Sequence, residues 1–182
     1  QAGRTQVATT ISFEVIADAL LKNLQHLSVQ AEAGAAKLTP VALIMRCLQK
    51  VLLKHPHFNA TINEQANELL LHQNVDIGLA VDSSEGLLVP VIRGLEQMDV
   101  FAISTEIRHM AELARSGELK HEDLKGSTFT LSSTGGLEKA MITATTPIIN
   151  YPNVATLWVS RINDRPRVAD GKLGAGPILS CS

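Results

Sequence analysis

The residues best placed to do chemistry lie between Gly126 and Gly136, where a β-type run ends in hydroxyl groups followed by a glycine turn. Ser132 and Ser133 close this run. A hydroxyl at the end of a strand can project into a cleft and donate a hydrogen bond to a developing oxyanion. Ser-Thr-Gly sequences are also common in plain β-turns, so this stretch by itself leaves both interpretations open.

Two histidine patterns are weaker candidates. His55 and His57 could form a His-x-His metal pair, but no Cys, Asp or Glu cluster accompanies them, and a basic helix end is the favoured interpretation. His72 and Asp76 have the spacing of a base and an orienting carboxylate. They lie at the mouth of a predicted strand, where we expect the two side chains to be well separated. The sequence therefore predicts no metal site.

The helices that must position these residues have clear boundary signals. Thr39 suits an N-cap and Pro40 the first helical position, while Pro56 ends the same helix. Asp99 is the predicted N-cap of a later helix that ends at Gly117. Another helix is expected to begin near residue 17. Its apolar residues recur at helical spacing, and they are Leu20, Leu21, Leu24 and Leu27.

The helix that begins at Pro40 is predicted to bury a broad apolar stripe and to turn Gln49 toward solvent. The stripe consists of Val41, Ile44, Met45, Leu48, Val51 and Leu52. Cys47 lies among apolar neighbours in this segment, which favours a core residue over a catalytic thiol.

Strands alternate with these helices. Apolar residues at every second position from Val75 to Val81 predict a half-buried strand, and a turn over residues 83–86 leads to a return strand over 87–92. Pro90 places that return strand at an edge or a bulge. Further strands are predicted within residues 5–15, 127–132, 153–162 and 177–182. This order predicts an α/β domain of the α+β two-layer kind, with a mixed sheet and helices packed on one face.

The composition excludes several classes of function. A hydrophobic content of 45% supplies a core, and a net charge of −2 gives no basic excess for binding nucleic acid or an anionic membrane. Two cysteines cannot form a disulfide framework, so a reducing compartment is expected. No apolar run could span a bilayer and no signal peptide opens the chain. Because the chain begins at Gln1 and not Met, we expect it to be a piece of a longer protein.

Five segments carry the most specific pattern in the chain. They are KLTP at 37–40, HPHFNA at 55–60, IGLAVDSSEGLLVPVI at 77–92, GSTFTLSS at 126–133 and TPIINYPNVA at 146–155. In this order they resemble the catalytic core domain of the acyltransferase component of 2-oxo acid dehydrogenase complexes, the dihydrolipoamide acyltransferase family. The resemblance covers nearly the whole chain.

The resemblance implies a chloramphenicol-acetyltransferase-like fold and a homotrimer that builds a larger cubic or icosahedral core. Coenzyme A enters a channel between subunits from one end, and the lipoyl group of a separate, mobile domain enters from the other. An acyl group then passes from dihydrolipoamide sulfur to the coenzyme A thiol. The implied partners are the lipoyl domain and the dehydrogenase components of the complex, the latter bound through parts absent from this chain. The implied compartment is the bacterial cytoplasm or the mitochondrial matrix.

The resemblance also assigns roles to individual residues. Ser132 matches the catalytic serine that hydrogen-bonds the tetrahedral oxyanion. Leu24 stands where relatives often carry a cofactor-contacting Arg, which removes one possible phosphate partner. Four residues fall where the family places coenzyme A contacts, and they are Thr39, Asp82, Ser133 and Ser160. Thr39 also has a complete structural explanation as an N-cap.

The general base of the family is a His in an Asp-His-Arg-x-x-x-Gly type motif, which follows a strand similar to 177–182. No residue of this chain matches that His. We therefore expect a single acyltransferase core domain over residues 1–182, incomplete at both ends and inactive by itself. The alternative is a catalytically silent structural homologue that assembles or decorates the multienzyme core. The parent sequence beyond Ser182 distinguishes the two.

Overall fold

The main sheet is seven-stranded and mixed. The computed structural model describes residues 8–30, 37–83, 86–136, 141–169 and 171–182. The strand order is β1-β11-β9-β8-β4-β7, with β10 paired to β11. β4, β8 and β9 are parallel to one another, and the other pairs are antiparallel. The bounds are β1 (Phe13–Ile16), β4 (Ile77–Leu79), β7 (Val91–Ile92), β8 (Phe129–Ser133), β9 (Thr156–Val159), β10 (Asn163–Ala169) and β11 (Lys172–Cys181).

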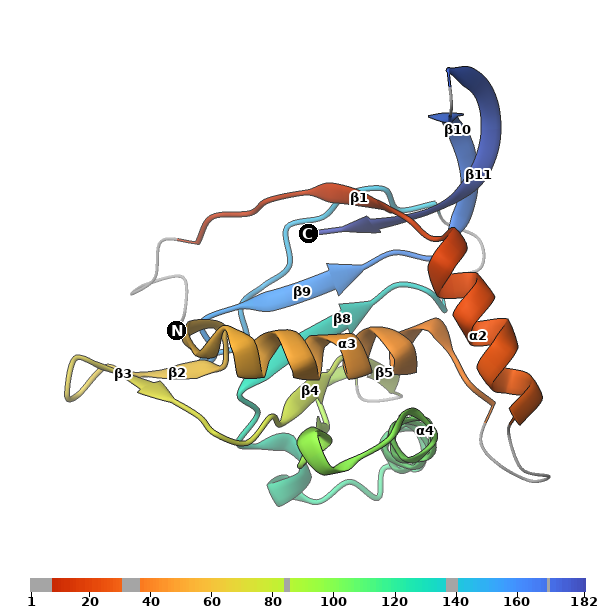
Figure 1. Ribbon diagram of the computed structural model, residues 1–182. Helices are drawn as coiled ribbons and strands as arrows, with labels where there is room; N and C mark the ends of the chain where they lie inside the picture. Colours follow the sequence, from red (N-terminus) through yellow and green to blue (C-terminus); the bar gives the residue numbers. More distant parts are fainter. Residues whose placement is uncertain (1–7, 31–36, 84–85, 137–140, 170) are drawn as a thin grey trace.

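Helices pack against one face of this sheet, which confirms the predicted two-layer arrangement. Figure 1 shows α3 (Pro40–Lys54) lying across the strands, α4 (Val100–Ser116) seen end-on beside it, and α2 (Asp18–Gln30) at the edge where the parallel strands end. Three short 3-10 turns connect the elements, and they are η1 (Pro56–Phe58), η2 (Leu95–Gln97) and η3 (His121–Leu124). The core joins α3 and α4 to the sheet through buried residues such as Met45, Ile103 and Leu131. None of the described helices is long and apolar enough to cross a membrane.

The predicted helix boundaries are confirmed. Thr39 Oγ1 accepts a hydrogen bond from the Ala42 N–H at 3.3 Å, and Pro40 opens α3. Asp99 Oδ1 accepts from the Ala102 N–H at 2.8 Å, and Gly117 ends α4 at a φ of 74°. A φ in this left-handed region favours glycine, because a Cβ would be strained there.

Three details predicted for α3 are wrong. Gln49 is buried, and its Oε1 accepts a hydrogen bond from Arg46 Nη1 at 2.6 Å. Position 49 is four residues from Met45 and three from Leu52, so helical geometry places it on the buried stripe despite its amide. Cys47 is exposed because it lies two residues, or about 200°, from Met45 around the helix. Val51, assigned to the stripe, is 49% exposed.

The hairpin after residue 75 is confirmed, and Pro90 divides it. The first strand, β4, is buried throughout and not half-buried as predicted, because it lies inside the sheet between β8 and β7. β5 (Val81–Ser83) pairs with β6 (Gly86–Leu88) as a separate two-stranded ribbon, while β4 pairs with β7 in the main sheet. Pro90 lies between β6 and β7, and its carbonyl accepts a hydrogen bond from the Leu79 N–H at 2.9 Å. Residues 84–85 of the predicted turn lie outside the described residues.

Two strand predictions differ from the structure in extent. β1 is confined to Phe13–Ile16, with residues 8–12 outside any strand and residues 5–7 not described. β10 and the first half of β11 were not predicted. Because these strands project from the sheet (Figure 1), their side chains carry little of the apolar alternation that indicates a strand. A further ribbon of β2 (Ala60–Asn63) and β3 (Glu68–Leu71) projects on the opposite side.

The β10–β11 arm is tied to α2 by an ion pair. Asp18, in the first turn of α2, accepts two hydrogen bonds from the Arg167 guanidinium, with Nη2 to Oδ1 at 2.9 Å. Arg167 crosses Gly176 on the paired strand, and a Cβ at that position would overlap the guanidinium. Glycine therefore leaves room for the guanidinium, and a Cβ at this position would displace the flexible Arg167 side chain.

Candidate active site

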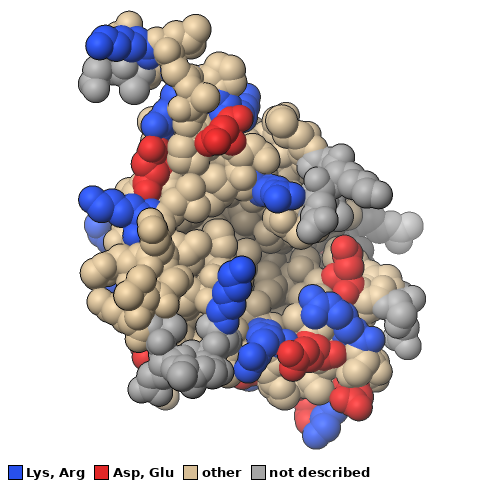
Figure 2. All heavy atoms as spheres, turned by 90° about the vertical axis from the view of Figure 1, so that its right-hand side faces the viewer, with Lys and Arg blue, Asp and Glu red and all other residues tan. Residues whose placement is uncertain are grey.

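The parallel strands β4, β8 and β9 end at the same edge of the sheet, and a cavity of about 780 Å³ lies against that edge. Its walls come from α2, from the first turn of α3, from the last turns of α4 and from the strand ends. Figure 2 views the molecule from this side and shows a hollow in the surface with Lys and Arg side chains beside it. Crevices at the carboxyl ends of parallel strands are common ligand sites in α/β proteins.

All four residues predicted to contact coenzyme A line this one cavity. Thr39 is the N-cap of α3, Asp82 lies on β5, Ser133 ends β8, and Ser160 follows β9. The chain spacing between Thr39 and Ser160 exceeds a hundred residues, so only the fold brings them together.

The hydroxyl groups of these residues differ in what they can still bond. Ser160 Oγ donates to the Arg161 carbonyl at 2.8 Å and accepts from the Ser180 N–H at 2.9 Å, so its proton is already used. Ser133 Oγ accepts from the Gly135 N–H at 3.2 Å, which leaves its proton free for a ligand. Thr39 Oγ1 accepts from the α3 backbone, and its proton is likewise free among the described residues.

The Ser132 side chain points away from this cavity, to the other face of the sheet. Successive strand residues point to opposite faces, and Ser133 lines the cavity whereas Ser132 does not. Ser132 is partly buried and lies across from Trp158 in the register of β8 and β9. Its hydroxyl has no hydrogen-bond partner in the described part of the chain.

The Trp158 side chain forms part of the surroundings of Ser132. It is 2% exposed, and its indole Nε1 is buried without a hydrogen-bond partner among the described residues. The backbone of Trp158 is fixed by reciprocal hydrogen bonds with Ser182, at 2.8 and 3.1 Å. Sequence reasoning did not select this residue, although it is the single tryptophan of the chain.

The histidine and carboxylate candidates have structural partners. His72 Nε2 lies 2.8 Å from Thr61 Oγ1, whereas Asp76 Oδ1 accepts from the Gly94 N–H at 2.7 Å, so the two side chains do not form a dyad. None of the described residues that line the 780 Å³ cavity is a histidine. Across the described ranges, no group of three His, Cys, Asp or Glu side chains could hold a metal ion.

A buried polar network anchors the start of β8, and sequence reasoning missed it. Asn153 Oδ1 accepts from Thr130 Oγ1 at 2.7 Å and from Ser127 Oγ at 3.2 Å, and its Nδ2 donates to the Ser127 carbonyl at 2.6 Å. Thr128 Oγ1 donates to Asn59 Oδ1 at 2.6 Å. The available signal was the run of hydroxyl residues inside a buried strand, because buried polar groups require partners.

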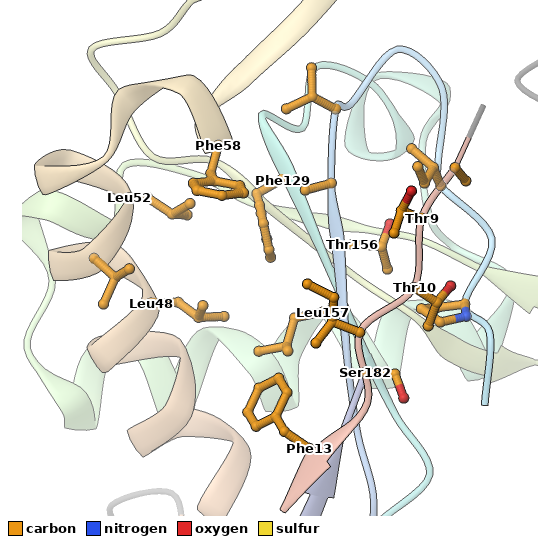
Figure 3. Close-up of a pocket in the computed structure, with 17 residues that line it drawn as sticks. Thr9, Thr10, Phe13, Leu48, Leu52, Phe58, Phe129, Thr156, Leu157 and Ser182 are labelled. Atoms are coloured by element: carbon orange, nitrogen blue, oxygen red, sulfur yellow. The ribbon is translucent and has the colours of Figure 1, made fainter. Parts of the chain in front are cut away.

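A second cavity, of about 490 Å³, lies between α3 and β1 and is almost entirely apolar. Figure 3 shows Leu48, Leu52, Phe58, Phe129 and Phe13 around it, with Thr9 and Thr10 on the facing segment. None of the described residues that line it has an ionisable side chain. Burial raises the pKa of the Cys181 thiol, which favours its protonated form.

The fold and the position of the 780 Å³ cavity, called the polar cavity from here on, define the class of protein. A chloramphenicol acetyltransferase structure superposes with a TM-score of 0.52 at 15% identity, over 94% of this chain and 77% of that chain, and so shares the fold. The family model for 2-oxoacid dehydrogenases acyltransferase (catalytic domain) matches residues 1–182. The chain belongs to this family.

Curated relatives agree with this assignment. The acetyltransferase component of the Staphylococcus aureus pyruvate dehydrogenase complex is 35% identical over 173 residues, which is 95% of this chain and 40% of the relative. The corresponding Staphylococcus epidermidis protein is 39% identical over 154 residues, covering 85% of this chain and 35% of the relative. The chain thus spans well under half the length of these relatives.

Solved structures are similar over the whole domain. A dihydrolipoamide acetyltransferase from Azotobacter vinelandii, studied for the catalytic roles of a serine, a histidine and an asparagine, has a TM-score of 0.89 at 32% identity. It matches 99% of this chain and 73% of that chain. The cubic core of a pyruvate dehydrogenase complex has a TM-score of 0.85 at 33% identity, over 95% of this chain and 70% of that chain.

Proposed function

We propose that this domain transfers an acyl group from S-acyldihydrolipoamide to the thiol of coenzyme A in the core of a 2-oxo acid dehydrogenase complex. The observation that carries the proposal is the convergence of Thr39, Asp82, Ser133 and Ser160 on one cavity at the ends of the parallel strands. Membership of the acyltransferase family and its relatives in pyruvate dehydrogenase complexes support it.

In the proposed reaction a general base removes the coenzyme A thiol proton, because a thiol with a pKa of about 8.5 is mostly protonated at neutral pH. The thiolate attacks the thioester carbonyl carbon, and Ser132 donates a hydrogen bond to the oxyanion that forms. The carbon–sulfur bond to dihydrolipoamide then breaks, and the leaving sulfur takes the proton back from the base. The products are acyl-coenzyme A and dihydrolipoamide.

The opposite orientations of Ser132 and Ser133 fit a substrate that passes around the end of β8. Both serines lie at the carboxyl end of β8, so a flexible thiol arm that passes around the strand end can reach both. In this arrangement Ser133 and Thr39 contact the coenzyme A body within the cavity, and Ser132 contacts the reacting carbonyl on the other face. A residue of an adjoining copy would complete the site there.

We further propose a homotrimer that assembles into a larger core, receives acyl groups from a lipoyl domain and works with dehydrogenase components. The similarity to a cubic core supports the assembly. The bacterial relatives favour a bacterial cytoplasm over the mitochondrial matrix. A catalytically silent homologue that only builds such a core is the second candidate, and it is favoured because none of the described residues that line the cavity is a histidine.

A coenzyme A acylation assay with acyl-dihydrolipoamide separates these proposals. It should be run on the 182-residue chain and on the complete gene product. We expect turnover only in the complete product, because none of the described residues that line the cavity is a histidine. A complete product that binds coenzyme A without turnover would favour the silent homologue. Turnover by the 182-residue chain would show that a base within it was overlooked, with His72→Gln as the first variant to test.

A further inference from the structure

The polar cavity contains two arginines that no assignment above explains. Arg115 lies in the last turn of α4, and Arg161 follows Ser160 at the end of β9. With Asp82 they are the charged residues among the described part of the lining, which carries a formal charge of +1. The first turn of α3, where Thr39 and Pro40 line the same cavity, adds the positive end of a helix dipole.

These two arginines differ from the others in the described ranges because their guanidinium groups have no hydrogen-bond or ion-pair partner there. Arg108, Arg165 and Arg167 form ion pairs with Glu112, Glu14 and Asp18. The remaining two are held by neutral acceptors, Arg46 by Gln49 Oε1 at 2.6 Å and Arg93 by the carbonyls of Glu122 and Lys125 at 2.7 and 2.8 Å. The guanidinium groups without a protein acceptor are therefore the pair that borders the cavity.

Arg161 is also positioned by its backbone. Its carbonyl accepts hydrogen bonds from Ser160 Oγ at 2.8 Å and from Asn163 Nδ2 at 3.1 Å, while Ser160 Oγ in turn accepts from the Ser180 N–H. The Ser160 proton is used in this way, so Ser160 positions the Arg161 backbone and has no proton to donate to a ligand. Arg115 is carried on a regular helix next to Ala114, which is buried.

We propose that Arg115 and Arg161 bind the phosphate groups of the acyl acceptor, so that the cavity selects a nucleotide-bearing thiol over plain pantetheine. This inference rests on the proposed acyl transfer to coenzyme A and names the residues that recognise its charged half. A guanidinium offers paired N–H donors that match two phosphate oxygens, which an ammonium cannot do. Asp82 repels phosphate, so the phosphate groups are expected to lie against the arginines and not against this carboxylate.

The test is isothermal titration calorimetry of the complete gene product with coenzyme A, 3′-dephospho-coenzyme A and pantetheine. The variants are Arg115→Ala, Arg161→Ala and the charge-retaining Arg161→Lys. The matched control is Arg108→Ala, which removes the same charge from α4 at an exposed, ion-paired position outside the cavity. Circular dichroism checks that each variant is folded.

We expect Arg115→Ala and Arg161→Ala each to weaken coenzyme A binding about tenfold or more, in line with the loss of a charged hydrogen bond. Pantetheine binding should be unchanged in both, and Arg161→Lys should recover only part of the loss. Binding of coenzyme A to the unmodified protein should weaken as ionic strength rises. Arg108→Ala should match the unmodified protein throughout.

The experiment distinguishes failure of the phosphate assignment from failure of the proposed acyl transfer. If coenzyme A binds but the two cavity variants behave like Arg108→Ala, the phosphate assignment is overturned and the proposed function stands. The same holds if pantetheine binding falls as much as coenzyme A binding, since the arginines would then act on the shape of the cavity. If coenzyme A does not bind the unmodified protein at all, the proposed acyl transfer fails together with this inference.

Discussion

Ser132 lies across from Trp158 in the parallel register of β8 and β9, and neither side chain has a hydrogen-bond partner within the described residues. Ser133, which follows Ser132 on β8, faces the polar cavity on the other side of the sheet. One strand end therefore presents a hydroxyl to each face, and the two hydroxyls should have separable effects on catalysis.

Ser132→Ala in an active, complete protein should lower turnover by about a hundredfold or more. Because the oxyanion exists only near the transition state, the KM for coenzyme A should hardly change. Ser133→Ala is the matched control, and it should raise that KM more than it lowers turnover. Steady-state kinetics with acyl-dihydrolipoamide measures both. Equal effects of the two variants, or normal turnover in Ser132→Ala, would remove Ser132 from the mechanism.

Trp158→Phe should change the free energy of unfolding by less than about 1 kcal/mol, because the substitution removes an indole N–H that is buried without a partner. Trp158→Ala should lower the free energy of unfolding by about 3–5 kcal/mol, because it leaves a cavity where an aromatic side chain is 2% exposed. Urea unfolding followed by far-ultraviolet circular dichroism compares the two. If Trp158→Phe is as damaging as Trp158→Ala, the N–H has a partner in solution.

Local signals predicted the elements that build the cavity wall. Thr39 with Pro40, and Asp99 with Gly117, fix the ends of α3 and α4 through backbone hydrogen bonds that depend on a few adjacent residues. The alternation before Val81 likewise fixes β4 and the hairpin. Such interactions are local, so the sequence carries them directly.

Features that depend on tertiary contacts were not predicted. Gln49 is buried because the helix turns it toward the core, where Arg46 supplies a donor, and its residue type gave the opposite expectation. The partners of Asn153 lie more than twenty residues away in the chain. The family resemblance identified the residues that converge on the cavity, whereas Arg115 and Arg161 emerged only from the fold.

The ion pair between Asp18 and Arg167 should make the stability of the β10–β11 arm depend on acid pH. The hydrogen bond from Arg167 holds the pKa of the Asp18 carboxyl below its ordinary value, and the Asp18 carboxylate raises the pKa of Arg167. The unfolded carboxyl titrates near a pKa of about 3.9. The stabilisation is therefore fully present above that pH and is lost as the pH falls through the lower pKa of the folded state.

Arg167→Gln should consequently lower the urea midpoint at neutral pH, and this difference from the unmodified protein should shrink below about pH 4. Gly176→Ala should act in the same direction while keeping the charge, because its Cβ would displace the Arg167 guanidinium. Midpoints measured across the acid range test both variants. A difference for Arg167→Gln that stays constant with pH would show that the ion pair makes no contribution.

Asn153→Ala should be among the most destabilising single changes near the site. Asn153 is fully buried, and its side chain satisfies two hydroxyls and one carbonyl on the segment that leads into β8. Removing the amide leaves these groups buried without partners, and each such group costs about 1–3 kcal/mol. We therefore expect a loss of about 3 kcal/mol or more in the free energy of unfolding, measured by urea denaturation.

Asn23→Ala provides the control for that measurement. Asn23 lies on the exposed surface of α2 and makes a single side-chain hydrogen bond, to the Ala19 carbonyl at 2.9 Å. Alanine is the better helix former, so the change should stay within about 0.5 kcal/mol. If Asn153→Ala cost no more than Asn23→Ala, the buried network would not anchor β8. The positions of Ser132 and Ser133 would then depend on the pairing of β8 with β4 and β9 alone, because those strands supply its remaining backbone hydrogen bonds.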